Sequence, residues 1–445
     1  MLQMVLGTDF GGLPGLIGRI LAVGAVGFWA YKKQGLTAWI FFALVAGIVI
    51  GLDAPALAVE LQVISKVFLK LIKSIIAPLL FATLAVGIAG HGNMASVGRM
   101  GGKSLIYFEV VTTFALIIGL LAINLTQVGV GIPLIKSTEA LAAAKQGSWQ
   151  DIVLHIFPEN IAAAVAEGQV LQVVVFSVLF GIGLAQLQGK AKQTMLSALD
   201  ALAEVMFKYT GLVMYLAPLA VGASMAYTVA KVGIGILGNL LGLLLTLYGA
   251  LIVFILVVLV PIGLITRLPF VRFWRAIAEP VALAFATTSS EAALPKAMRA
   301  MESLGVPRRI VAFVMPTGYS FNLDGTTLYL ALASVFVAQA AGIELSWQVQ
   351  VQMVLTLMLT SKGVAGVPRA SLVILSGTVA SFGLPSEPIF IILGIDALMD
   401  MARTSVNVIG NCLATWVIAR WEGVDPDEEL QNQALSLQGE PLETH

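Results

Sequence analysis

Long apolar stretches constrain the fold of this chain more than any other feature of its sequence. Six of them can cross the roughly 30 Å hydrocarbon core of a membrane as α-helices, and two further runs follow. Of the 445 residues, 58% are hydrophobic and 11% are charged, whereas a soluble domain has about 25% charged residues. The sequence therefore predicts an all-α polytopic membrane protein. The stretches lie near residues 36–52, 61–89, 104–128, 169–187, 197–230, 235–264, 309–341 and 386–420.

The sidedness of the chain is indicated by basic residues that cluster in alternate links between the apolar stretches. Because such links stay in the cytoplasm, we expect a multi-pass inner (plasma) membrane protein with a cytoplasmic C-terminus. The basic residues are Lys32, Lys33, Arg99, Lys103, Lys190, Lys192, Arg267, Arg272, Arg275, Lys296, Arg299, Arg308 and Arg309.

Both ends of the chain differ from this pattern. Residues 421–445 are polar and acidic, so we expect a cytoplasmic tail there. Residues 1–35 contain a further apolar run, which Arg19 interrupts and which no basic leader precedes. This favours an N-terminal extension with an additional helix over a signal peptide.

Composition also argues against several classes of function. The formal net charge is zero, which provides no electrostatic field for nucleic acid. One cysteine, Cys412, excludes a disulfide within the chain and a cysteine-built metal site, and the three histidines match no metal-binding motif. We therefore expect neither an enzyme nor a cofactor, no nucleic-acid partner and no confident metal site.

Two apolar segments are interrupted at their centres by small and polar residues. The first, residues 270–305, contains Thr-Thr-Ser-Ser-Glu, and the second, residues 348–384, contains Gly-Val-Ala-Gly-Val-Pro. Each half is too short to cross a bilayer, and irregular backbone at membrane depth persists only where it is buried in protein or lines a cavity. Paired interrupted segments point to the binding site of a secondary transporter. We therefore predict two re-entrant hairpins.

A third irregular segment, from Gly318 to Thr326, lies between the hairpins in the run at 309–341. It contains Asn322-Leu-Asp324-Gly325, and glycine costs about 1 kcal/mol in a helix relative to alanine while Asn and Asp compete for backbone hydrogen bonds. Either the helix is unwound here, so that free carbonyls and Asp324 bind a hard cation, or it contains a kink capped by Asn322 and Asp324. We favour the cation site, because a kink leaves a mid-membrane carboxylate without a role.

A polar stripe lies within the last apolar run, at 386–420. Five of its members are spaced by four, three, four and four residues, which places them on one face of an α-helix. A charge at mid-membrane costs at least ~3 kcal/mol, so such side chains usually face a protein interior and mark a functional site. The stripe consists of Asp396, Asp400, Arg403, Asn407 and Asn411, with Thr404 beside them.

Four ordered motifs resemble those of the dicarboxylate/amino acid:cation symporters, which have the glutamate transporter fold. The resemblance covers about residues 36–422 and is strongest to bacterial proton-coupled glutamate/aspartate symporters. It implies eight transmembrane helices, two re-entrant helical hairpins, inverted repeats and a homotrimer in the lipid bilayer. The motifs are Ser289-Ser290…Leu294-Pro295, Asn322-Leu-Asp-Gly-Thr326, Gly363-Val-Ala-Gly-Val-Pro368 and Asp400-Met-Ala-Arg403-Thr404-x-x-Asn407.

The same resemblance implies a division of labour along the chain. Residues 36–97 and 129–234 would form a scaffold that makes the trimer contacts. Residues 98–128 and 235–420 would form a transport domain, with the hairpins at about 270–305 and 348–384, that moves as an elevator.

By the resemblance, substrate would lie between the hairpin tips, the broken helix and the polar stripe. Arg403 would take the side-chain carboxylate of the substrate in a planar bidentate contact, and Asp400 its amino group. Alternatively, these i,i+3 neighbours form only a structural ion pair. The implied substrate-binding residues are Thr288, Ser289, Ser290, Thr326, Val367, Pro368, Ala370, Ser371, Asp400, Arg403, Thr404 and Asn407.

Asp400 bears on the choice of substrate. C4-dicarboxylate carriers resemble this chain from Met315 to Thr326 but typically have a non-acidic residue in the position of Asp400. A dicarboxylate has no amino group, and an acidic side chain facing it would be repelled. Asp400 therefore favours glutamate or aspartate.

Asn411 bears on the coupling cation. Sodium-coupled members of the family have an aspartate at this position, and a small apolar residue and a threonine in the positions of Lys362 and Val364. Proton coupling requires a carboxyl group that can titrate near neutral pH in a buried site, for which Glu109, Glu291 and Asp324 are candidates. We favour protons over sodium. The candidate cation-coupling residues are Glu109, Glu291, Gly318, Asn322, Asp324, Ser361, Lys362 and Asn411.

The sequence thus predicts a secondary active symporter that takes up acidic amino acids with protons. A C4-dicarboxylate:proton symporter and a sodium-coupled acidic amino acid symporter are the alternatives within the family. A gated anion channel is the alternative from another class, although no ring of basic residues supports it.

Overall fold

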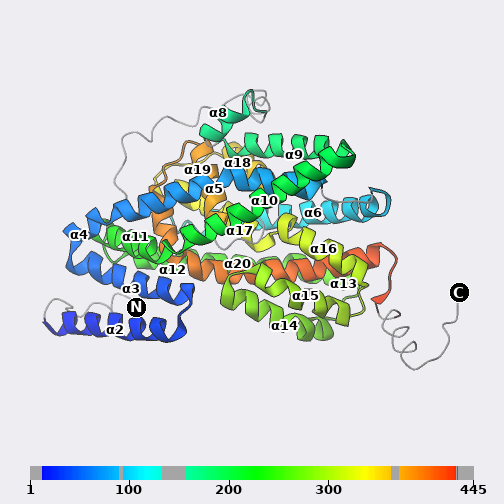
Figure 1. Ribbon diagram of the computed structural model, residues 1–445. Coiled ribbons are helices and arrows are strands. Elements are labelled where there is room, and N and C mark those ends of the chain that lie inside the picture. The colour runs from blue at the N-terminus through cyan, green and yellow to red at the C-terminus, as the bar shows by residue number, and fades with distance from the viewer. Residues whose placement is uncertain are drawn as a thin grey trace.

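Every regular element in the described part of the computed structural model is a helix (Figure 1). The structure describes residues 13–89, 94–132, 157–167, 169–361, 370–426 and 428. The predicted all-α class is therefore confirmed for these residues. Among them, five helices are long and apolar enough to cross a membrane, and the bent pair α10–α11 adds a sixth span if it counts as one.

The helices of the first half of the chain are mostly long and apolar. They are α2 (Leu13–Lys33), α3 (Leu36–Asp53), α4 (Pro55–Glu60), α5 (Gln62–Ala89), α6 (Met94–Thr126), α8 (Ile161–Ala166), α9 (Val170–Gln186), α10 (Gly189–Met214) and α11 (Ala217–Val232).

The second half contains the interrupted segments and the polar stripe. Its helices are α12 (Ile236–Phe254), the π-helix η1 (Ile255–Leu259), α13 (Val260–Ile265), α14 (Phe270–Thr287), α15 (Ser290–Ser303), α16 (Arg308–Phe321), α17 (Asp324–Ala340), α18 (Trp347–Thr360), α19 (Ala370–Ser381) and α20 (Glu387–Trp421).

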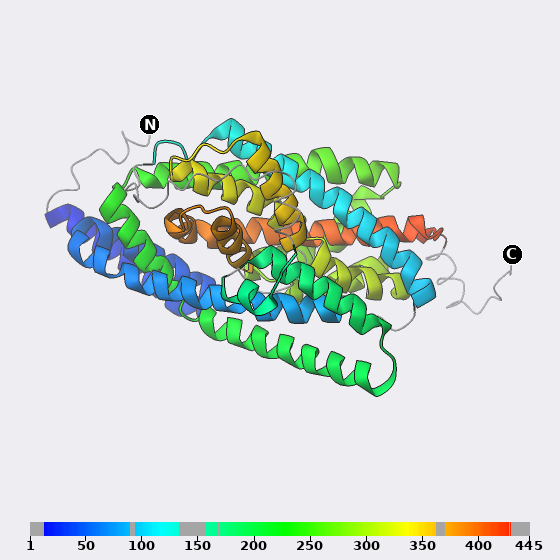
Figure 2. The same cartoon turned by 90° about the horizontal axis from the view of Figure 1, so that it is seen from above.

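Helix packing divides the chain into two groups. In the first group, α3, α4, α5 and α10 pack against α11 or against each other, and α9 packs against α5. In the second group, α6, α12 and α14 to α17 surround α20, which runs through the middle of the molecule in both views (Figures 1 and 2). Because α20 is buried almost throughout, its polar stripe faces other helices. The groups meet where α11 contacts α20 and α19 contacts α5.

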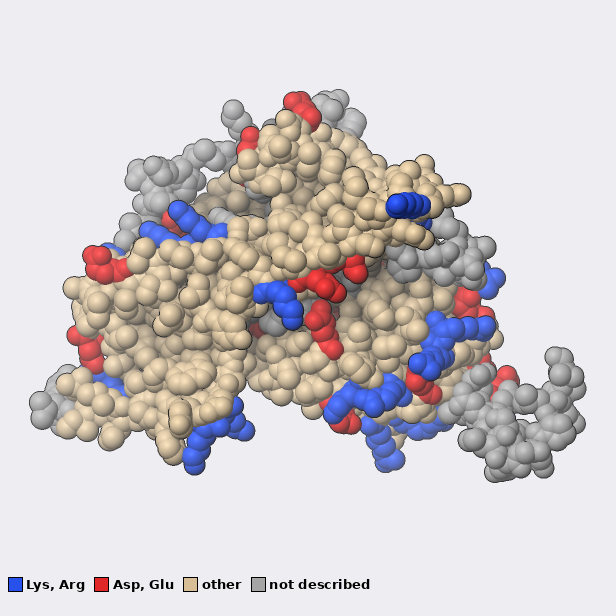
Figure 3. Space-filling model, in the orientation of Figure 1, with Lys and Arg blue, Asp and Glu red and all other residues tan. Residues whose placement is uncertain are grey.

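Most of the visible surface is uncharged, as expected for a protein that faces lipid (Figure 3). Near the end of α20, Glu422 forms ion pairs with Lys103 (2.6 Å) and Arg99 (3.0 Å) on α6. The Lys103 ammonium and the Arg99 guanidinium hold the pKa of Glu422 below its ordinary value. These two ion pairs connect the end of α20 to the first turns of α6.

Two predicted stretches are not single straight helices. The stretch at 197–230 is bent by 48° between α10 and α11, beside Pro218, which lacks the backbone N–H of a regular helix. The run at 309–341 breaks between α16 and α17, where Asn322 and Leu323 have non-helical backbone angles. The backbone is therefore unwound at Asn322 and Leu323, as the first of the two alternatives requires; the cation site stays a prediction.

Both interrupted segments form pairs of short helices. In the first, α14 and α15 are joined at Thr288, which has a left-handed φ of 53° that a non-glycine residue rarely adopts. Lys296 on α15 is bonded to Glu279 on α14, so the two arms are held together. The second segment consists of α18 and α19, and its centre, residues 362–369, lies outside the described residues.

Small residues allow α3 and α11 to pack closely. Ala43, Gly47 and Gly51 lie four residues apart on α3, and a Cβ atom at Gly47 would overlap the backbone oxygen of Gly222 on α11. A Cβ at Gly222 would lie 2.9 Å from the backbone oxygen of Ala43. This is the small-residue packing that lets membrane helices approach each other.

The substitution Gly47→Ala should therefore destabilise the protein, because overpacking costs about 1–3 kcal/mol. We expect a lower melting temperature of the detergent-solubilised protein. Gly249→Ala on α12 is the matched control, since a Cβ there meets nothing within 4 Å. Equal melting temperatures for the two variants would contradict the close contact between α3 and α11.

Candidate functional site

The candidate site lies where the break between α16 and α17 meets the middle of α20. Two glycines permit this approach. A Cβ at Gly325 would overlap the backbone oxygen of Arg403, and a Cβ at Gly410 would overlap Oδ2 of Asp324. Gly325 and Gly410 therefore bring the start of α17 into direct contact with the polar face of α20.

Asn407 on α20 caps the first turn of α17. Its Oδ1 accepts hydrogen bonds from the backbone N–H groups of Gly325 (2.8 Å) and Thr326 (3.2 Å). Its Nδ2 donates to Oγ1 of Thr326 (2.9 Å). The first N–H groups of a helix lack partners within the helix, so an amide supplied by another helix fixes the position of α17.

One turn further along α20, Asn411 faces the break itself. Its Nδ2 donates to the backbone oxygens of Asn322 (3.1 Å) and Asn407 (2.8 Å). The Nδ2 of Asn322 in turn donates to Oδ2 of Asp324 (3.1 Å). Asn322, Asp324 and Asn411 are fully buried, and we call them the Asn411 cluster. Among the described residues, Oδ1 of Asn322 and Oδ1 of Asn411 have no hydrogen-bond partner.

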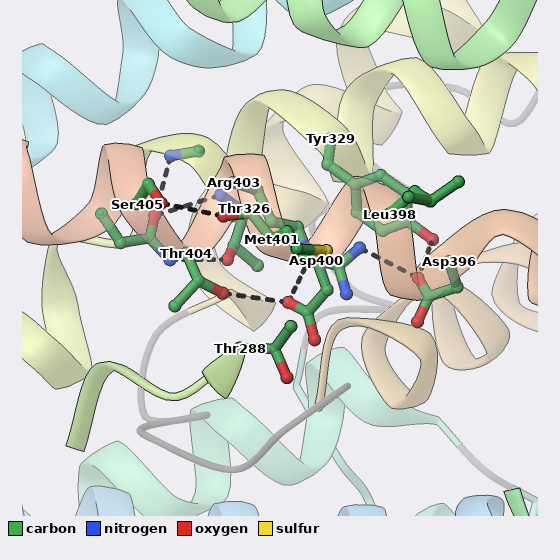
Figure 4. Close-up of polar contacts among 12 residues, drawn as sticks. Thr288, Thr326, Tyr329, Asp396, Leu398, Asp400, Met401, Arg403, Thr404 and Ser405 are labelled. Atoms are coloured by element: carbon green, nitrogen blue, oxygen red, sulfur yellow. Dashed lines mark hydrogen bonds and ion pairs between the residues drawn. The ribbon is translucent and has the colours of Figure 1, made fainter. Parts of the chain in front are cut away.

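One turn before Asn407 on α20, the Arg403 guanidinium is shared between two buried carboxylates (Figure 4). Its Nε donates to Oδ1 of Asp400 (2.9 Å) and its Nη1 to Oδ1 of Asp396 (3.0 Å). The guanidinium also lies over the ring of Tyr329 on α17, with Cζ 4.2 Å from the ring centroid. Thr404 donates to Oδ1 of Asp400 (3.0 Å).

This arrangement leaves a donor available for a ligand. Within the described part of the chain, Nη2 of Arg403 has no hydrogen-bond partner although it is buried. A buried guanidinium N–H without a partner is costly, and an anion supplies the missing acceptor. The ion pair between Asp400 and Arg403, left open by the sequence, is thus formed through Nε and does not use the whole guanidinium.

Two residues of the site were not assigned a role from the sequence. Asp396 was part of the polar stripe, and its position seven residues before Arg403 places it on the same face of α20. Tyr329 donates to Oδ1 of Asp396 (3.3 Å). Tyr329 carries no sequence signal for this role, because its contact with Arg403 depends on how α17 packs against α20.

The first hairpin contributes its centre to the same region. Thr288 lies beside Asp400 in Figure 4. Ser289 caps α15, because its Oγ accepts a hydrogen bond from the backbone N–H of Ala292 (3.3 Å), and Ser290 is buried. Both α14 and α15 pack against α20.

The second hairpin is described only in part. Ser371 on α19 is buried, and its Oγ has no hydrogen-bond partner among the described residues. Three predicted positions, Lys362, Val367 and Pro368, lie outside the described residues, as does the side chain of Ala370.

The remaining cation candidates are distributed over several helices. Gly318 is buried, and a Cβ there would overlap Oδ1 of Asn411, so Gly318 belongs with the Asn411 cluster. Ser361 is buried at the end of α18. Glu109 is half-buried on α6, and Glu291 is exposed in the first turn of α15. Of the three carboxyl groups proposed to carry a proton, only that of Asp324 is fully buried in this cluster.

Comparison with known proteins identifies the family. Residues 36–421 match the model of the sodium:dicarboxylate symporter family. The chain belongs to this family. The resemblance predicted from the four motifs is thereby confirmed, and the protein is a multi-pass membrane transporter and not an enzyme.

Three relatives show the range of activities in the family. The chain is 40% identical over 419 residues to the proton/sodium-glutamate symport protein of Geobacillus stearothermophilus. The matched region covers 92% of this chain and 99% of the relative. It is 42% identical over 409 residues to the proton/glutamate-aspartate symporter of Escherichia coli (86% and 92%). It is 41% identical over 409 residues to the C4-dicarboxylate transport protein of Burkholderia ambifaria (90% and 95%).

The buried charges of Asp396, Asp400 and Arg403 should stabilise this symporter only when all three are present. Arg403→Met leaves Asp396 and Asp400 buried without their cation, which costs about 3–5 kcal/mol, so we expect a markedly lower melting temperature. The triple variant with Asp396→Asn and Asp400→Asn should recover most of the loss. Arg99→Met, which removes a 71% exposed partner of Glu422, should change the melting temperature little. Equal stability of Arg403→Met and the parent protein would contradict the buried network.

Proposed function

We propose that this protein is a secondary active symporter that takes up glutamate or aspartate together with protons. The observation that carries the proposal is the pairing of Asp400 with Arg403 at 2.9 Å in the buried centre of α20. One relative is described as a glutamate-aspartate symporter and another as a C4-dicarboxylate transport protein, so the family alone leaves both substrate classes open.

The charges of the site favour a substrate with an amino group. Asp396, Asp400 and Arg403 together carry a net charge of −1 if both acids are ionised. A dicarboxylate would add two negative charges to this buried group, whereas glutamate or aspartate adds one net negative charge and an ammonium that Asp400 can accept. In a low-dielectric site this difference of one charge is worth far more than in water. Nη2 of Arg403 then binds the side-chain carboxylate of the substrate.

The other predicted substrate contacts complete this proposal. Thr288, Ser289 and Ser290 would close the pocket from the first hairpin, and Ser371 from the second. Two helices, α15 and α17, begin at the site, and the positive ends of their dipoles favour an anionic ligand. Thr326, Thr404 and Asn407 would line the remaining wall, together with Val367, Pro368 and Ala370.

The substitution Asp400→Ser tests the amino group contact. Removal of the carboxylate should weaken binding of glutamate and aspartate about tenfold or more, the loss expected for one charge-assisted hydrogen bond. Succinate should bind as well as before or better, because Arg403 loses a competing anion. The measurement is competition for radiolabelled substrate in proteoliposomes. Ser405→Ala is the control, since Ser405 bonds only within its own helix, to Met401, among the described contacts. Equal losses for the amino acids and for succinate would contradict the assignment.

The Asn411 cluster supports protons as the coupling ions. The amide of Asn411 donates to two backbone oxygens, and these oxygens are the kind of ligand that a sodium ion requires. A carboxylate in this position could not donate to them and would instead add a negative charge. The side-chain N–H groups of Asn411 therefore bind the carbonyl oxygens that would otherwise coordinate a cation.

We assign the transported proton to Asp324. It is the fully buried carboxyl group of the cluster, and it accepts a hydrogen bond from Asn322. A change in its protonation would therefore change a hydrogen bond at the break between α16 and α17. Glu291 is exposed, and Glu109 is half-buried on α6. Gly318 and Ser361 would then serve the structure of the site and not a sodium ion.

The substitution Asn411→Asp tests this account of the coupling ion. It removes the two hydrogen bonds to carbonyl oxygens and adds a carboxylate, so uptake should become stimulated by sodium. The matched control is Asn239→Asp on α12, where an Nδ2 that donates to the backbone oxygen of Val128 (3.0 Å) is also lost. We expect no sodium response in the control. If uptake by Asn411→Asp is as indifferent to sodium as uptake by the control, Asn411 is not what excludes the ion.

We also propose the architecture and movement that the resemblance implies. Eight transmembrane helices and two re-entrant hairpins would form a homotrimer with cytoplasmic C-termini. Residues 36–97 and 129–234 would be the scaffold, and residues 98–128 and 235–420 the transport domain of an elevator. The division of the helices into two packing groups supports this proposal, because α6 packs with the group around α20 although it lies in the first half of the chain.

A further inference from the structure

The helix α2 precedes the part of the chain that matches the family. The match begins at residue 36, whereas α2 spans Leu13–Lys33. Its 21 residues extend about 31 Å at 1.5 Å per residue, which equals the thickness of the hydrocarbon core. α2 is not among the helices that length and composition identify as spans, so its contacts decide what it does.

Three contacts show that α2 runs antiparallel along the length of α3. Near the turn between the helices, a Cβ at Gly27 would lie 3.0 Å from the ring of Phe42, and the rings of Trp29 and Phe41 lie 6.4 Å apart with an edge-on geometry. At the far end, Arg19 on α2 bonds to Asp53, the last residue of α3. Because α3 is one of the membrane-competent helices, a helix beside it along this length crosses the same layer.

The charges of α2 are placed as a spanning helix requires. Residues 20–31 are uncharged, and Arg19 reaches both carboxylate oxygens of Asp53 at 3.1 and 2.6 Å. A bidentate pair of this kind removes much of the cost of an arginine near the membrane boundary. Lys32 and Lys33 are the last two residues of α2, and the positive-inside rule places this end of the helix in the cytoplasm.

The outer face of α2 is apolar and uncovered. Ile17, Ile20, Leu21 and Phe28 are 50–67% exposed. In Figure 3 the surface at the lower left, over α2, is mostly uncharged between the charged groups near its two ends. Trp29 and Tyr31 are also exposed near these lysines, and such aromatic residues sit at the membrane–water boundary. Lipid acyl chains are the partner that this surface fits.

We propose that α2 is an additional membrane-spanning helix that packs on α3, faces lipid with its outer surface and has its Leu13 end on the outer side of the membrane. The Leu13 end of α2 would then lie on the side of the membrane opposite to Lys32 and Lys33. The α2–α3 hairpin, closed by the ion pair between Arg19 and Asp53, enlarges the lipid-facing side of the first packing group.

Cysteine labelling in intact cells tests the sidedness. Thr8→Cys should react with a membrane-impermeant maleimide from outside, and Lys33→Cys should react only after the membrane is permeabilised. The unaltered chain gives the background, since its one cysteine, Cys412, is buried. If Thr8→Cys also reacts only after permeabilisation, α2 does not cross the membrane and the proposal is wrong.

Membrane depth provides an independent measurement on the helix itself. Nitroxide labels on cysteines at Ile17, Leu21 and Phe28 report how accessible each site is to oxygen and to a water-soluble nickel complex. A spanning helix predicts the greatest depth at Leu21, near its middle, and smaller depths at the other two positions. Equal depths at all three positions would mean that α2 lies in the membrane surface, which overturns the proposal.

Discussion

The site depends on one guanidinium held between two carboxylates inside a membrane protein. Arg403 is 1% exposed, and its bonds to Asp396 and Asp400 fix both the charge and the direction of its free donor. Tyr329 ties this group to α17, and Asn407 ties α17 back to α20. The broken helix therefore cannot shift along α20 without exchanging contacts that hold buried polar atoms. This links a ligand at Arg403 to the geometry of the break.

The break connects the ligand region with the Asn411 cluster. The same segment that presents Thr326 to Asn407 presents the backbone oxygen of Asn322 to Asn411 and the carboxyl of Asp324 to Asn322. A change in charge at Asp324 thus acts on atoms that are one turn of α20 away from the substrate contacts. In the proposed symporter this short path couples the proton to the substrate.

The sequence predicted the helical class, the interruption of two apolar segments and the polar face of α20, because hydrophobic length and helical spacing depend only on local order. It also placed Asp400, Arg403, Asn407 and Asn411 on one face, which the structure confirms. It could not assign Tyr329, because that contact arises from packing between helices. It could not decide between an ion pair and a ligand contact for Arg403, because the answer depends on which guanidinium nitrogens are used.

In the proposed symporter, a buried arginine–aspartate site moves an acidic amino acid together with protons. Uptake of radiolabelled glutamate or aspartate into liposomes, with the sodium and pH gradients imposed separately, tests it most directly. We predict uptake in sodium-free buffer when the outside is more acidic than the inside, with little added by a sodium gradient. Uptake that follows an inward sodium gradient and ignores the pH gradient would contradict it.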